Sequence, residues 1–145
     1  VAPIDQVRRV LDYAVTRIPA DKVLLGMPNY GYDWTLPFVE GSAARVVSNV
    51  EAVDIAARYG AEIRYDERSQ APFFNYFDEE GRRHEVWFDD ARSIRARLRL
   101  IAEYGLAGLS YWTIDNLFRA QYLVLSALFT IREHGGGAVE TFSVW

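Results

Sequence analysis

The spacing of apolar residues along the chain predicts four helices. In each segment apolar side chains recur three and four residues apart, which places them on one helical face. Pro3 suits the first turn of the first segment, and Ser48 with Glu51 has the pattern of a capping box before the second. Asp89 or Asp90 is expected to cap the third. The four predicted helices cover residues 3–18, 48–60, 90–104 and 117–131.

Two continuous apolar runs, residues 23–27 and 106–112, predict short strands that are buried on both faces. Such runs are typical of a parallel sheet covered by helices. Residues 73–77 and 84–88 flank an Asp-Glu-Glu-Gly turn, which predicts an antiparallel hairpin. The aromatic stretch 29–37, which follows the first run, is expected to be an irregular loop.

The order of these elements predicts an α/β fold in which β/α units surround an antiparallel α+β insertion. The boundaries expected from the pattern divide the chain into residues 1–41, 42–88, 89–134 and a tail of 135–145. In β/α architectures the functional residues lie at the carboxyl ends of the parallel strands. A site is therefore expected around residues 29–34 and 112–116.

Composition excludes several classes of function. The chain of 145 residues has a net charge of −4, so duplex nucleic acid is not an expected partner, and no apolar run reaches membrane-spanning length. There is no Cys, and His84 and His134 are too far apart in sequence for a usual zinc motif, so no metal site is predicted. No phosphate-binding loop is present, and we expect no cofactor.

Aromatic side chains cluster at both predicted strand ends. Tyr30, Tyr32 and Trp34 follow the first strand, and Trp112 ends the second. Aromatic rings at such positions stack on the C–H faces of sugars, which predicts a sugar-binding platform. A buried aromatic core is the alternative explanation, and the sequence leaves both open.

Acidic residues at the same ends are few. Asp33 and Asp115 are the acids expected at this face, where either would orient a hydroxyl or acetamido group. Neither has a visible acid partner of the kind that a two-carboxylate glycosidase needs. No residue of the chain is therefore predicted to be catalytic.

Three blocks in order resemble glycoside hydrolase family 18. KVLLGMPNYGYDW (22–34) resembles the seventh strand and its loop, VWFDDARSI (86–94) the return from the insertion domain, and GLAGLSYW (105–112) the eighth strand. The resemblance is greatest to bacterial cell-wall and spore-cortex N-acetylglucosaminidases. It implies that this chain is the C-terminal part of a (β/α)8 barrel with an inserted α+β subdomain.

The resemblance also implies a function. The family hydrolyses β-1,4 bonds at N-acetylglucosamine in peptidoglycan or chitin-like glycans, with the substrate's own acetamido group as the nucleophile. Its signature Asp-x-x-Asp-x-Asp-x-Glu does not occur in these 145 residues and is expected upstream, so the isolated chain is predicted to be inactive. By position, Trp112 would form the floor of the sugar site, and Tyr30 and Tyr32 its wall.

Further expectations concern context. The resemblance implies a secreted, cell-envelope or spore-associated protein that binds an N-acetylglucosamine-containing glycan. A non-catalytic glycan-binding or interaction module, or a purely structural α+β domain, is an alternative. Because the two apolar strands would leave edges open to pairing, the isolated chain is expected to form a homo-oligomer, most simply a dimer.

Overall fold

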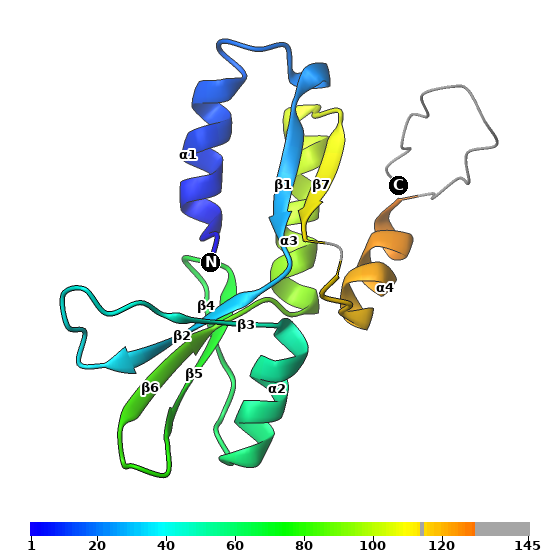
Figure 1. The fold of residues 1–145 in the computed structure, drawn as a ribbon. Helices are drawn as coiled ribbons and strands as arrows, with labels where there is room; N and C mark the ends of the chain where they lie inside the picture. The colour runs from blue at the N-terminus through cyan, green and yellow to red at the C-terminus, as the bar shows by residue number, and fades with distance from the viewer. Residues whose placement is uncertain (114, 130–145) are drawn as a thin grey trace.

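The computed structural model describes residues 1–113 and 115–129 (Figure 1). This part of the chain contains two sheets and four α-helices. The elements in order are α1 Ile4–Ala14, a 3-10 turn Ala20–Lys22, β1 Leu24–Pro28, β2 Gly31–Leu36, β3 Arg45–Val47, α2 Asn49–Arg58, β4 Arg64–Asp66, β5 Ala71–Phe77, β6 Arg83–Trp87, α3 Ala91–Tyr104, β7 Gly108–Trp112 and α4 Arg119–Leu128.

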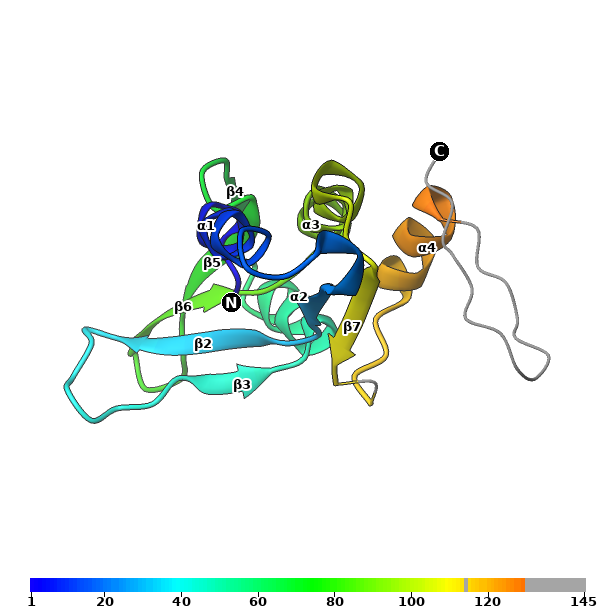
Figure 2. The same ribbon diagram turned by 90° about the horizontal axis from the view of Figure 1, so that it is seen from above.

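The two predicted apolar strands pair in parallel, as expected for neighbouring strands of a β/α barrel. β1 and β7 run side by side, with Leu25 opposite Leu109 and Pro28 opposite Trp112. Helices α1, α3 and α4 lie on one side of this pair (Figure 2). The mixed α/β arrangement agrees with the predicted fold class.

The prediction that these strands are buried on both faces is wrong for this chain. Leu25 and Met27 are buried, whereas Leu24 is 57% exposed and Gly26 is also exposed. Side chains of a strand alternate between its two faces. The helices cover one face, and no element of the described chain covers the other.

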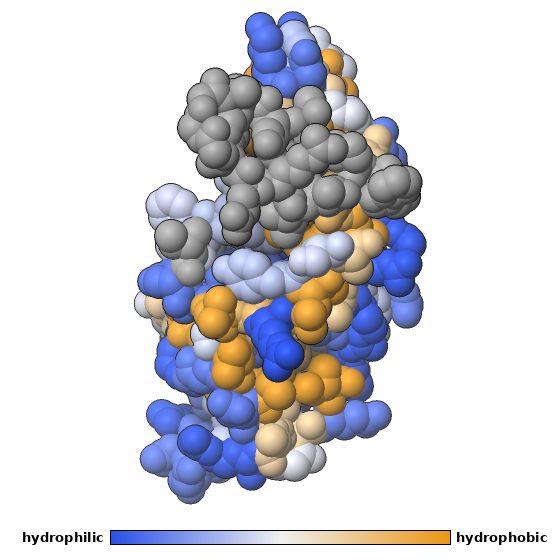
Figure 3. All heavy atoms as spheres, turned by 90° about the vertical axis from the view of Figure 1, so that its right-hand side faces the viewer, coloured by the Kyte–Doolittle hydropathy of each residue, from blue (hydrophilic) through white to orange (hydrophobic). Residues whose placement is uncertain are grey.

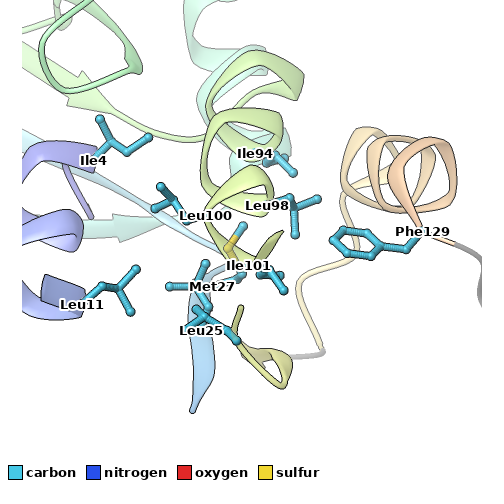
Figure 4. Packing of buried hydrophobic residues seen from close by; sticks show 10 residues of the cluster. Ile4, Leu11, Leu25, Met27, Ile94, Leu98, Leu100, Ile101 and Phe129 are labelled. Atoms are coloured by element: carbon cyan, nitrogen blue, oxygen red, sulfur yellow. The ribbon is translucent and has the colours of Figure 1, made fainter. Parts of the chain in front are cut away.

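A hydrophobic core joins the β1–β7 pair to its helices (Figure 4). Leu25 and Met27 point from β1 toward the stripe of α3, which Leu98 and Ile101 represent. The other buried members come from α1 and α3, from the segment just before β7, and from the residue that follows α4. They are Ile4, Leu11, Ile94, Leu100, Leu106 and Phe129.

The remaining strands form a five-stranded antiparallel sheet in the order β3-β2-β6-β5-β4, with α2 packed on one face. This confirms the hairpin, which is now β5–β6. The irregular loop expected over residues 29–37 is wrong, because residues 31–36 form β2 and pair with both β3 and β6. The five-stranded sheet therefore begins before residue 42, the predicted start of the insertion. The boundaries between subdomains stay a prediction.

Local signals at the helix ends agree with the sequence. The Ser48 hydroxyl accepts from the Glu51 amide at 3.0 Å, and Gly105 ends α3 in the left-handed conformation at φ +65°. Asp90 rather than Asp89 caps α3. The last helix is described from Arg119, and residues 130–131 and the tail 135–145 lie outside the described residues.

A buried ion pair joins Asp89, the residue that follows the insertion, to α3. The Arg97 guanidinium donates to both carboxylate oxygens of Asp89, and the Ser93 hydroxyl donates to the same carboxylate at 2.8 Å. The Asp89 amide donates in turn to Asn49 Oδ1 at 2.9 Å, at the start of α2. This contact fixes the return of the chain from the five-stranded sheet.

Candidate sugar-binding site

The carboxyl ends of β1 and β7 are held together by one buried residue, Asn29. Its amide donates to the Trp112 carbonyl at 3.0 Å, and its Nδ2 donates to the carbonyls of Thr113, at 2.9 Å, and Asn116. Asn29 is 2% exposed, so these bonds form in a water-poor environment where they restrict the loop most. Asn29 is not among the residues predicted for the site, although its place directly after an apolar strand is a signal that could have marked it.

Trp112 lies at the end of β7 with 69% of its surface exposed. A tryptophan of the core would be covered, so the core explanation does not fit this residue within the described structure. Asp115 is also exposed on the following loop, where the Thr113 hydroxyl donates to its carboxylate. Both predicted residues therefore face solvent beside the joined strand ends.

Tyr30, directly before β2, and Tyr32 and Trp34 within it form a continuous aromatic run. The Tyr30 and Tyr32 rings meet edge to face with centroids 5.6 Å apart, and the Tyr32 and Trp34 rings lie 5.9 Å apart at 55°. Burial, together with the neighbouring Tyr32, raises the pKa of Tyr30. The phenol, like any tyrosine at neutral pH, is protonated and can donate a hydrogen bond.

Asp33 does not join this group. It points to the opposite face of β2, and its side chain is 2% exposed. Its carboxylate accepts from the Tyr76 hydroxyl at 2.8 Å and from Arg45 at 3.1 Å, and it lies 2.8 Å from His84 Nδ1. Because its three partners lie inside the insertion, this carboxylate stabilises the fold and is not turned toward a ligand.

The network around Asp33 continues to the hairpin turn. His84 bridges two carboxylates, because its Nε2 lies 3.1 Å from Asp78. Partial burial acts to raise the pKa of Asp78, but hydrogen bonds from Arg82 and His84 outweigh it and hold that pKa well below its ordinary value. Burial, and the bond to Asp33, raise the pKa of Tyr76. The hairpin turn thus has a buried anchor in the Asp78 carboxylate.

No group of three or more His, Cys, Asp and Glu side chains in the described part of the chain could hold a metal ion. Among the same residues, no helix is both long and apolar enough to span a bilayer. These two findings concern the described residues alone.

Residues 4–116 match the family model described as Glycosyl hydrolases family 18, and the chain belongs to this family. It is 51% identical over 132 residues to the "Cortical fragment-lytic enzyme" of Bacillus subtilis (strain 168), covering 90% of this chain and 31% of that protein. The chain therefore spans about a third of the length of this relative.

Solved structures show the same relationship. The spore cortex-lytic enzyme SleL of Bacillus megaterium QM B1551 matches with a TM-score of 0.84 and 49% identity, over 87% of this chain and 30% of that one. A chitinase from Chromobacterium violaceum matches with a TM-score of 0.81 and 37% identity, over 87% and 38%. Together they identify the fold as the C-terminal part of the family's TIM barrel.

Proposed function

We propose that this chain contributes the sugar-binding wall of a glycosidase acting on β-1,4 bonds at N-acetylglucosamine in peptidoglycan. The observation that carries the proposal is the exposed Trp112 on strand ends that Asn29 joins. Similarity to a cortical fragment-lytic enzyme and to a spore cortex-lytic enzyme favours a cell-wall glycan as substrate. It also favours a spore-associated or cell-envelope location.

Each exposed side chain has a chemical role in this proposal. The Trp112 ring stacks on the apolar C–H face of a sugar, while the phenols of Tyr30 and Tyr32 donate to its hydroxyl or acetamido oxygens. Asp115 accepts a hydrogen bond from a sugar hydroxyl or the acetamido N–H. Asp33, which the sequence assigns to substrate binding, is instead a positioning residue that holds β2 from the face opposite to Tyr32 and Trp34.

We further propose substrate-assisted hydrolysis with retention. The acetamido oxygen of the bound sugar attacks its anomeric carbon, the glycosidic C–O bond breaks, and a general acid protonates the leaving oxygen. Water then opens the resulting ring at the same carbon. The printed sequence contains no Asp-x-x-Asp-x-Asp-x-Glu, so the residues described above bind and orient the sugar and do not protonate it.

Binding can be tested with the 145-residue chain itself. We expect chitotetraose to shift the indole N–H signal of Trp112 in an NMR titration, and Trp112→Ala to abolish binding. Tyr13→Ala is the matched control, because Tyr13 is a similarly exposed aromatic on α1. A Trp112 signal that does not respond to the sugar, in a chain whose circular dichroism shows it folded, would overturn the proposed site.

The same preparation tests the division between binding and catalysis. We expect no hydrolysis of a chromogenic N-acetylglucosaminide, since a missing general acid alone costs a factor of about 10² to 10⁴ in rate. Turnover above the buffer blank that is lost in Asp115→Asn would show that the chemistry lies in this chain.

A further inference from the structure

Asn29 contacts the loop that follows β7 at both of its ends. Its backbone amide donates to the Trp112 carbonyl, and its Nδ2 donates to the carbonyls of Thr113 and Asn116. These contacts bridge more than 80 positions of sequence, because Asn29 directly follows β1. A single residue of one strand end thus holds the loop that begins at the other.

The orientation of the Asn29 carboxamide is fixed by the groups that it faces. Backbone carbonyls accept hydrogen bonds and cannot donate them, so the NH2 group rather than Oδ1 must point to Thr113 and Asn116. Among the described residues the buried Oδ1 has no hydrogen-bond partner. The hydrogen bonds that this side chain makes are therefore all directed to one loop.

That loop carries two of the residues proposed to contact sugar. Trp112 stands at its start, and Asp115 lies between the two carbonyls that Asn29 holds. The Thr113 hydroxyl donates to the Asp115 carboxylate, while the Thr113 carbonyl accepts from Asn29. The backbone that carries the indole ring and the backbone that carries the carboxylate are thus fixed to the same buried side chain.

An exposed ring depends on its backbone for its position. Trp112 and Asp115 are both exposed, so few packing contacts of their own hold them in place. Binding groups that move freely must be ordered when a ligand binds, and this ordering costs affinity. A buried clamp behind them reduces that cost before the ligand arrives.

We propose that Asn29 is a positioning residue of the sugar site. It acts through Trp112 and Asp115, whose relative position it sets, and does not itself touch the sugar. This inference rests on the proposed function and adds the residue that organises the site. Loss of the two Nδ2 bonds should free the loop and weaken sugar binding about tenfold.

The variant Asn29→Asp tests this role because it has almost the same shape and adds an ionisable group. As a neutral acid it still donates one hydrogen bond to the loop, whereas the ionised form places a buried charge against two carbonyl oxygens. Burial favours the neutral acid, so ionisation is expected above about pH 4, the ordinary value for Asp. The sugar affinity of this variant should approach that of the wild type at low pH and fall about tenfold as the pH rises.

Two readouts follow the variants across this pH range. The heteronuclear NOE of the Trp112 indole and of the Asp115 and Asn116 amides reports motion of the loop without sugar, and an NMR titration with chitotetraose reports affinity. In Asn29→Asp both should change together. Asn29→Leu has neither donor nor charge, so its loop should be mobile and its binding about tenfold weaker at every pH. Tyr30 and Asp115 are ionisable groups that adjoin Asn29 in sequence or in the loop, and the wild type measured at each pH corrects for them.

Asn49→Asp is the matched control. Asn49 is equally buried, at the start of α2, and its Oδ1 accepts from the Asp89 amide. This variant places a buried carboxyl in the insertion instead, so it should change neither the motion of Trp112 nor the affinity wherever circular dichroism shows the chain folded.

The outcomes separate this inference from the proposed function. A loop as rigid in Asn29→Leu as in the wild type, or an Asn29→Asp affinity that does not depend on pH, would overturn the inference alone if the wild type still binds chitotetraose. An equal loss in Asn49→Asp would also overturn it, because the effect would then be a general loss of stability. If the wild-type Trp112 signal does not respond to chitotetraose, the proposed function fails and this inference fails with it.

Discussion

Removing the buried partner of Asp89 is expected to destabilise the chain strongly. Arg97 is 1% exposed and donates to both oxygens of the Asp89 carboxylate, so Arg97→Met leaves a buried carboxylate without its countercharge. The Ser93 hydroxyl and the Asn49 contact remain, but neither carries a positive charge. Breaking a buried pair in this way costs about 3–5 kcal/mol of unfolding free energy.

That loss is a large part of the total. A domain of this size is stable by about 5–15 kcal/mol, and each kcal/mol corresponds to roughly 3 °C in the midpoint of thermal unfolding. We therefore expect Arg97→Met to lower the midpoint by roughly 10–15 °C. Urea unfolding followed by circular dichroism gives the free energy directly, and an unchanged slope against urea would show that both states kept their compactness.

A double-mutant cycle tests the reasoning behind this number. The double variant Asp89→Leu, Arg97→Met removes both buried charges together. Much of the stability that each single variant loses should therefore be regained. The expected coupling free energy is about 2–4 kcal/mol. Single variants that lose less than about 1 kcal/mol, or a double variant no more stable than the worse single one, would refute the assignment of this pair as a buried linkage.

Three further predictions concern packing, pH and assembly. Gly31→Ala should lower the free energy of unfolding by about 2–3 kcal/mol, because its Cβ would lie 2.4 Å from the Trp87 carbonyl oxygen. Gly26→Ala, whose Cβ would have nothing within 4 Å, should change that free energy by no more than about 0.5 kcal/mol in urea unfolding. Because the pKa of Asp78 is lowered in the folded chain, its carboxylate stabilises the fold fully above its ordinary pKa of 3.8. This stabilisation is lost as the pH falls below that value. Asp78→Asn should therefore flatten the fall in stability at acid pH, and a slope equal to the wild type would contradict this. The chain should dimerise through the exposed apolar face that includes Leu24, and light scattering should show Leu24→Glu as a monomer while Phe77→Ser on the hairpin stays dimeric; a wild-type monomer at high concentration would contradict it.

The exposed apolar side chains behind the dimer prediction come from several elements. Leu24 lies on β1, Leu117 precedes α4 and Leu123 lies within it. The face on which α4 lies shows hydrophobic side chains gathered below the grey region (Figure 3). Apolar patches of this kind seldom stay in water, and β1 and β7 each have an outer edge with no strand partner in the described chain.

Much of the fold could be predicted because its signals are local. Helical spacing, Ser48 and Gly105 each act within a few residues, and the structure has the corresponding helices. β2 was missed because its evidence is long-range. Aromatic residues around Gly31 look like a loop until pairing with β6 is known, and the glycine is required there by the close approach of the Trp87 carbonyl.

The same missing strand explains why the predicted site residues do not all lie on one side of the sheet. If residues 29–34 are a loop, Tyr32, Asp33 and Trp34 can all face one ligand, and the prediction from sequence groups them in that way. In a strand, odd and even positions must separate, which sends Asp33 to Tyr76 and His84 and leaves Tyr32 and Trp34 on the other side. Trp87 then becomes a neighbour of Tyr32 through strand pairing alone, which nothing in its own segment indicates. Sequence could identify aromatic chemistry at the strand ends, but the side of the sheet on which each residue acts depends on the register of β2.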